Sequence, residues 1–231
     1  MTMPQHMQIP RAYLDPPANT LIDRMNTEHP SHRLSKPSGS FTSVLEVINE
    51  CDVENSPRYA PRKEGNRRLT FCNVYACDVC YLLGAYLPAV WWKREALKRL
   101  MRGEAVPNKE QNIDYLNVNG IYGWLEEFGN EFGWQSLPDA STAQNEANAG
   151  KLVVIIASKQ RDSRHGHISI VVPETSMTRR VIQPGNVIPV QSQAGAKNYR
   201  MSTAMGAWWL KDVYTGYGFW KTAIGSPDSD H

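Results

Sequence analysis

The 231-residue sequence has no apolar run of the roughly 20 residues that a membrane-spanning helix needs, so we expect no membrane span. Residues 1–11 show no basic start followed by an apolar stretch, and we therefore predict no secretory signal of the general export route. Excess charge of one sign is also lacking, since 25 Lys and Arg nearly balance 23 Asp and Glu to give a net charge of +2. This balance argues against a protein built mainly to bind nucleic acid.

Cysteine is rare, with four residues in the chain, of which three fall within residues 72–80. Three cysteines in one predicted helix make a poor framework for disulfides. Cys77 and Cys80 could instead join His165 and His167 as the four ligands of a zinc ion. Zinc-binding Cys-x-x-Cys pairs usually lie on polar turns, whereas this pair lies in an apolar, helical setting. We therefore favour core packing of Cys77 and Cys80, and we expect no metal or other cofactor.

The prolines indicate how the chain is organised. Residues 1–40 hold six of the fifteen prolines and lack sustained periodicity, which predicts an extended or flexible N-terminal arm. The 41% apolar content is enough for a core, and we expect residues 41–231 to form one domain. Basic residues cluster at 58–68 and 93–102. We interpret both clusters as solvated surfaces, with attraction to an anionic polymer as the alternative.

The apolar periodicity changes character along the chain. Helices are predicted for residues 40–50, 70–83, 92–102, 121–132 and 141–148. Strands are predicted for residues 152–157, 167–172, 181–183 and 187–193, and a closing hairpin for 208–214 with 217–222. Residues 51–68 and 112–119 are expected to be loops. Helices followed by an antiparallel sheet predict an α+β fold.

The strongest functional signal lies in residues 70–78, TFCNVYACD. Thr70 is a good N-cap, and the apolar positions after it recur at helical spacing. Cys72 is therefore predicted to lie in the first turn of a buried helix. There, unpaired backbone N–H groups and the helix dipole favour the thiolate and lower the pKa of the thiol. A cysteine placed in this way is a candidate nucleophile if a histidine can reach it.

Two histidines lie far downstream, at the start of the predicted strand 167–172. His167 begins the strand, whereas His165 lies in a loop with two arginines, so we assign the role of base to His167. On its own, His167 would be interpreted as a structural histidine whose hydrogen bonds are satisfied on a sheet face. We assign it a catalytic role because Cys72 supplies a nucleophile for it to act on. A cysteine that opens a helix and a histidine that opens a strand are the arrangement of papain-like cysteine hydrolases.

A third polar group must orient the imidazole, and three glutamines are candidates. Gln191 and Gln193 share one face of their strand by alternation, and the Ala-Gly pair after Gln193 allows the chain to pass close to the site. We therefore assign Gln193 to this role. Gln183 precedes a turn that is expected only to connect two strands, and it stays the alternative. A neutral amide orients a ring but stabilises imidazolium less than a carboxylate does.

These segments resemble those of a known family. Residues 55–78, with PRY at 57–59, TFCN at 70–73 and Asp78, resemble the cysteine segment of NlpC/P60 and CHAP-type peptidoglycan hydrolases. GHISIV at 166–171 resembles the histidine strand of that family, and QAG at 193–195 with Asn198 resembles the segment that holds its third residue. Similar phage and bacterial proteins share Ala143-Gln144 and the pattern Ala147-Asn148-x-Gly150.

The resemblance covers about residues 55–199 and implies a papain-like fold that cleaves an amide bond in cell-wall peptide, within the stem or between stem and glycan. With neither a recognisable wall-binding repeat nor a signal peptide, the chain resembles type VI secretion amidases and endopeptidases, or phage lysis enzymes. We therefore expect a monomeric antibacterial toxin, made in the cytoplasm and delivered to the target-cell periplasm, with an immunity protein and a secretion carrier as partners. The alternatives are a papain-like hydrolase of a protein or other acyl substrate, and a non-catalytic zinc- or wall-binding module.

Overall fold

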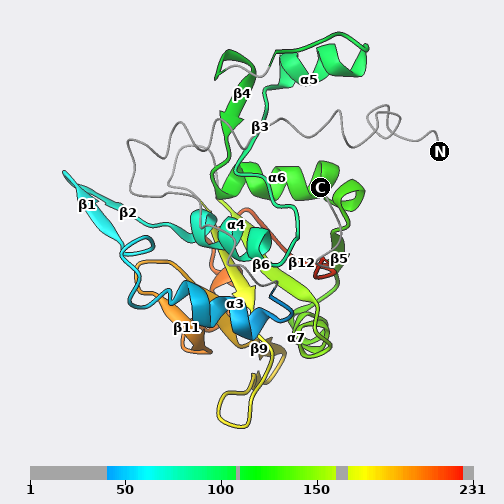
Figure 1. Ribbon diagram of the computed structural model, residues 1–231. Coiled ribbons are helices and arrows are strands. Elements are labelled where there is room, and N and C mark those ends of the chain that lie inside the picture. Colours follow the sequence, from blue (N-terminus) through cyan, green and yellow to red (C-terminus); the bar gives the residue numbers. More distant parts are fainter. Residues whose placement is uncertain (1–40, 108–109, 160–165, 226–231) are drawn as a thin grey trace. The chain divides into compact units, whose positions relative to one another are not determined.

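Figure 1 shows the computed structural model, which describes residues 41–107, 110–159 and 166–225. These residues divide into two compact units, a smaller one of residues 88–116 and a larger one of residues 41–87 and 117–225. The predicted arm at residues 1–40 lies outside the described residues, and one domain over residues 41–231 stays a prediction. Within the described ranges, no helix is both long enough and apolar enough to cross a membrane.

The larger unit is built on a six-stranded sheet with the strand order β11-β10-β7-β6-β12-β5. Its strands are β5 (Gln135–Leu137), β6 (Leu152–Ser158), β7 (His167–Val171), β10 (Gln191–Gln193), β11 (Tyr199–Ser202) and β12 (Gly216–Thr222). All neighbouring strands are antiparallel, so the prediction of an α+β fold with an antiparallel sheet is confirmed. The apolar run at residues 152–157 forms the central strand β6 as predicted, and its side chains are buried because helices cover it.

Helices pack on this sheet and position the candidate site. They are α3 (Val44–Cys51), α4 (Cys72–Leu82), α6 (Val118–Phe128) and α7 (Ala140–Asn148), with short 3-10 helices η3 (Gly129–Phe132) and η4 (Trp208–Leu210). Helix α4 contacts β7 and β10, α6 contacts β6, and α7 contacts β6 and β12. A capping box between Ser43 and Glu46 begins α3, and the Asp139 side chain caps α7.

Strand alternation gives the sheet a buried face that supports His167. Val153, Ile155 and Ala157 of β6 point to this face and pack with α7, η4 and β12 in one hydrophobic core. His167 pairs with Ala157 across the β6–β7 ladder, so it shares this face. The candidate base therefore stands at the end of a well-packed core.

Several predicted elements are wrong, because strand partners far along the chain decide them. Residues 208–214 were predicted to be one strand of a hairpin, but η4 begins this segment and β12 pairs with β5 and β6. The predicted strand 187–193 is divided into β9 (Asn186–Ile188), which pairs with β8 (Val181–Gln183), and β10. Proline between them has no N–H to donate to a ladder. The expected loop 51–68 contains the hairpin β1 (Arg62–Glu64) and β2 (Arg67–Leu69).

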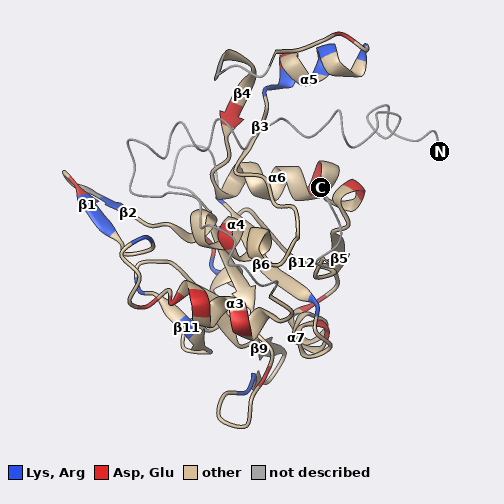
Figure 2. Ribbon diagram, in the orientation of Figure 1, with Lys and Arg blue, Asp and Glu red and all other residues tan. Residues whose placement is uncertain are grey.

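The smaller unit pairs β3 (Val90–Trp92) with β4 (Ile113–Tyr115) and contains α5 (Arg94–Met101) and η2 (Glu110–Asn112). The helix predicted at 92–102 begins at Arg94 instead, because Trp92 pairs with Ile113, and the expected loop 112–119 holds β4. Basic residues of α5 alternate along the ribbon with acidic ones of the helix and of the segment after it (Figure 2). Lys98 pairs with Glu95, and both Arg99 and Arg102 pair with Glu104, as expected for a solvated surface.

Candidate functional site

Cys72 is the first residue of α4, so the prediction that it lies in the first turn of a helix is confirmed. The predicted N-cap is wrong: Phe71 occupies that position and makes no side-chain cap. The Thr70 side chain instead forms a hydrogen bond with the Cys72 sulfur. The helix ends at Leu82. Gly84 follows in the left-handed conformation at φ 69°, which is typical of a glycine that ends a helix.

The electrostatic state of Cys72 differs from the prediction. The residue is only 4% exposed, and burial raises the pKa of its thiol because the thiolate loses its hydration. Hydrogen bonds from the backbone of Ile168, from the first turn of α4 and from Thr70 lower the pKa, but they do not outweigh burial. The predicted exposed sulfur with a lowered pKa is therefore wrong. At rest, Cys72 is a protonated thiol.

The same contacts join the cysteine helix to the other strands of the site. The Cys72 sulfur lies within hydrogen-bond reach of the backbone of Ile168, which follows His167 directly. The Tyr75 hydroxyl lies 2.6 Å from the Ser192 hydroxyl, which connects α4 to β10. The start of α4 is thereby held next to the strands that carry the candidate base and the candidate orienting residue.

Asn119 of α6 fixes the position of His167, a role that sequence analysis missed. Its Oδ1 accepts hydrogen bonds from the backbone N–H groups of Lys159 and Gly166, each at 3.0 Å, and its Nδ2 donates to the Lys159 carbonyl. At Gly166, a Cβ atom would lie 2.1 Å from the Ala157 carbonyl oxygen, so only glycine fits. Glycine before the histidine was visible in the sequence, whereas nothing in the sequence singled out Asn119.

The structure brings His167 and Gln193 together through a hydrogen bond between His167 Nε2 and Gln193 Oε1. The amide nitrogen of Gln193 donates to the Lys197 carbonyl at 2.9 Å, so its oxygen faces the ring. Because that oxygen can only accept, Nε2 must carry the hydrogen. The lone pair of Nδ1 is then available to accept a proton.

The other two glutamines do not contact His167. Gln191 is fully buried, and its Oε1 accepts hydrogen bonds from Ser169 Oγ at 2.9 Å and Trp208 Nε1 at 2.7 Å. The second bond holds the Trp208 ring edge-on to His167, with the ring centroids 4.6 Å apart. Gln183 is exposed on the separate hairpin β8–β9. The catalytic role of Gln193 stays a prediction, but its position is the one this role requires.

The surroundings of His167 keep its imidazole neutral. The pKa of the ring is lowered from 6.5 to about 4, mainly by burial and to a smaller extent by the positive charge of Lys159. The hydrogen bond from the ring to Gln193 acts in the opposite direction but is the weaker effect. At neutral pH the site therefore holds a thiol and a neutral imidazole, not a thiolate–imidazolium pair.

A buried ion pair anchors α4 to the preceding segment. Asp78 accepts hydrogen bonds from Arg58 Nε at 2.7 Å, from a second guanidinium nitrogen at 2.8 Å, and from the Tyr59 hydroxyl at 2.9 Å. The interpretation of residues 58–68 as a solvated surface is wrong for Arg58, because its guanidinium is needed to pair with a buried carboxylate. This cluster holds α4, and with it Cys72, in place.

Of the remaining cysteines, Cys51 lies next to the Tyr59 and Asp78 side chains of this cluster. Cys80 is fully buried, as predicted for core packing, and Cys77 is partly exposed. Burial raises the pKa of Cys51 to about 12. In the part of the chain that the structure describes, no group of three or more His, Cys, Asp and Glu side chains could hold a metal ion. The alternative zinc site also requires His165, which lies outside that part.

No protein-family model matches the chain, and no curated protein sequence matches it either. The resemblance to NlpC/P60 and CHAP-type hydrolases stays a prediction, carried by the motifs and by the geometry of Cys72, His167 and Gln193.

Proposed function

We propose that this chain is a papain-like cysteine hydrolase that cleaves an amide bond of cell-wall peptide. In this proposal Cys72 is the nucleophile, His167 is the general base and Gln193 orients the imidazole. One observation carries it: His167 bonds to Gln193 through Nε2, next to the strand position that contacts the Cys72 sulfur. His167 thus bonds to Gln193 through one ring nitrogen, and the next residue of its strand, Ile168, lies at the cysteine that begins the helix.

The neutral resting state defines the order of the proposed steps. As Cys72 Sγ attacks the amide carbonyl carbon, the thiol proton passes to His167 Nδ1. The C–N bond then breaks, the proton passes to the leaving amine, and the acyl group stays on Cys72 as a thioester. Water then attacks the thioester carbonyl while His167 accepts a proton from the water. The C–S bond breaks, the acyl group leaves as a carboxylic acid, and His167 returns the proton to the Cys72 sulfur. The first step needs a hydrogen bond from the Cys72 thiol to His167 Nδ1. Catalytic hydrogen bonds of this kind often tighten only when substrate binds.

The residues that carry the family resemblance also hold this site together, which supports the proposal. Arg58 and Tyr59 bind Asp78 of α4. Asn198 accepts a hydrogen bond from the Gly195 N–H and donates to the Val53 and Tyr59 carbonyls.

Gln144 is another residue of the resemblance with a structural role. It is fully buried, donates to the Val172 carbonyl at 2.8 Å and accepts from the Val190 N–H at 2.8 Å. It thereby joins the end of β7 to the residue that precedes β10. The motif residues away from the reacting atoms thus fix the strands that carry His167 and Gln193.

Digestion of purified peptidoglycan with the full chain tests the proposal, with the released fragments identified by mass spectrometry. Cys72→Ala and Cys72→Ser should each abolish fragment release while the thermal unfolding transition is retained. Cys77→Ala is the matched control, because Cys77 lies on the same helix and has no proposed role. Full release by either Cys72 variant would refute the mechanism. The fragment masses also identify the bond that is cut.

The proposal places the activity in the periplasm of a target cell, where peptidoglycan lies. The protein should be harmless when made in the cytoplasm of a Gram-negative host and lytic when an added leader directs it to the periplasm. Cys72→Ala directed to the periplasm is the control. Equal toxicity in both compartments would indicate a cytoplasmic substrate instead.

A further inference from the structure

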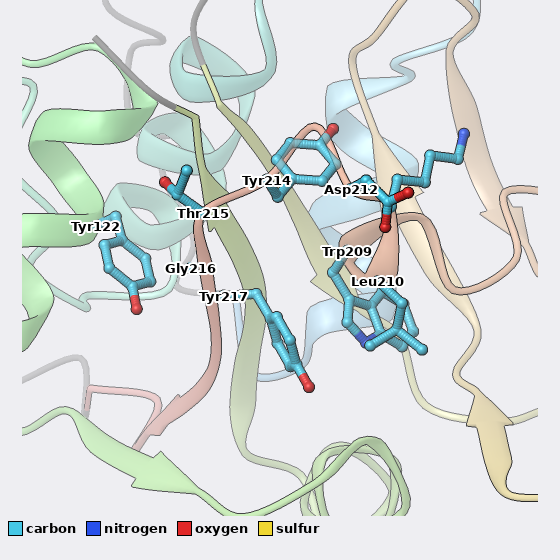
Figure 3. A pocket seen from close by; sticks show the side chains of 9 residues that line it. Tyr122, Trp209, Leu210, Asp212, Tyr214, Thr215, Gly216 and Tyr217 are labelled. Atoms are coloured by element: carbon cyan, nitrogen blue, oxygen red, sulfur yellow. The ribbon is translucent and has the colours of Figure 1, made fainter.

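A pocket of about 420 Å³ lies on the larger unit, lined by the segment between η4 and β12 and by α6. Its walls include Tyr122, Tyr214, Tyr217, Asp212 and Thr215 (Figure 3). A volume of this size is within the range of about 300–1,000 Å³ that is usual for small-ligand sites. None of the proposed catalytic residues lines it, so it needs an explanation of its own.

Tyr214 connects this pocket to the proposed site. Its ring centroid lies 5.5 Å from that of Trp208, whose ring packs in turn against His167. Lys159, whose charge acts on His167, lies with its Nζ 5.2 Å from the centroid of the Tyr214 ring. The rings of Tyr214 and Trp208 therefore connect the pocket to His167.

The pocket presents aromatic rings together with hydroxyl groups. Tyr122 and Tyr217 project on opposite sides of the chain at Gly216, with both hydroxyls toward the same end of the view (Figure 3). Gly216 allows this approach, since a Cβ there would lie 3.0 Å from the Tyr122 hydroxyl. Tyr217 is 46% exposed, so part of its side chain can be reached from solvent. Tyrosine offers a rigid apolar face and a polar tip, which suits a ligand that has both.

The charges that line the pocket narrow the ligand class. Lys211 and Asp212 balance each other, so the lining has no excess positive charge to select the carboxylates of an acidic stem peptide. The lining offers tyrosine rings with hydroxyl groups, the Thr215 hydroxyl and the Asp212 carboxylate. These groups suit a neutral, ring-shaped ligand that has C–H faces, hydroxyl groups and an amide.

We infer that this pocket binds an N-acetylated amino sugar of the glycan strand, so that the enzyme recognises the glycan as well as the peptide. The inference rests on the proposed function. It deepens that function by naming which part of the polymer is held next to the site.

Calorimetric titration of the full chain carrying Cys72→Ala tests the inference, with chitotetraose and with a sugar-free stem peptide as probes. Chitotetraose should bind saturably. Adding Tyr217→Ala should weaken that binding about tenfold, the size expected for loss of one stacked ring, and leave stem-peptide binding unchanged. Tyr115→Ala is the matched control: Tyr115 is 45% exposed, lies on β4 and does not line the pocket. It should leave chitotetraose binding unchanged.

The inference is overturned if chitotetraose does not bind, if Tyr217→Ala binds it as tightly as its parent, or if Tyr115→Ala weakens it equally. Unfolding transitions of all variants show whether a loss reflects misfolding, and Tyr217→Phe, which keeps the ring, should retain most of the affinity. Digestion by the wild-type chain without sugar binding would refute the pocket alone. Sugar binding combined with full activity of the Cys72 variants would refute the catalytic proposal alone.

Discussion

The neutral state of His167 makes the stability of the fold depend on pH, with a sign and size that follow from the structure. The pKa of the ring is about 4 in the folded chain, whereas the ordinary value for an unfolded histidine is 6.5. As pH falls below 6.5, the unfolded chain binds a proton that the folded chain does not bind until about pH 4. The free energy of unfolding therefore falls across this interval. The loss is up to about 3 kcal/mol, since one pKa unit corresponds to about 1.4 kcal/mol, and the partial exposure of His167 makes this an upper value.

Urea unfolding of the wild-type chain and of His167→Gln, from about pH 7 down to about pH 3, measures this effect. Both chains carry the same carboxylates, so their titration cancels in the difference between the two unfolding free energies. With falling pH the wild-type chain should lose stability relative to the variant, and the difference should level off below pH 4. The acid limb of kcat/KM should also lie near pH 4, because His167 must be neutral to accept the thiol proton. A stability difference that stays constant over this range would refute the view that burial keeps His167 neutral.

Three further predictions concern the residues around the site. Gln193→Ala should lower kcat about 10–100-fold with little change in KM, as expected for loss of a group that orients a catalytic histidine. Gln183→Ala should match the wild type. The reverse result on the same muropeptide would move the role to Gln183. Gln193→Glu should move the acid limb of the pH–rate profile to higher pH, because a carboxylate beside Nε2 stabilises imidazolium, and an unmoved limb would contradict the hydrogen-bond assignment. Asp78→Asn should lower the free energy of unfolding by about 3 kcal/mol in urea titrations, because the buried Arg58 loses the counter-charge of Asp78. Glu95→Gln, which removes an exposed ion pair, should cause no measurable change. Equal effects of the two substitutions would contradict a stabilising role of the buried ion pair.

The sequence by itself determined the parts of the fold that depend on local patterns. The run at residues 152–157 is apolar and β-branched, so it is a buried strand in any arrangement that forms a core. The helical spacing after Cys72 and the glycine at position 84 similarly set the start and end of α4, within a residue or two. Glycine before His167 and the alternation after it placed the histidine at the start of a strand.

Only the tertiary structure decided the state and the partners of these residues. The helix start predicted a lowered thiol pKa for Cys72, but burial, which depends on segments distant in the chain, raises it. Gln191 and Gln193 are equivalent by alternation, and strand pairing directs the first to Ser169 and the second to His167. Local patterns establish which side chains can share a face, whereas desolvation and hydrogen bonding are set by neighbours that only the folded chain brings together.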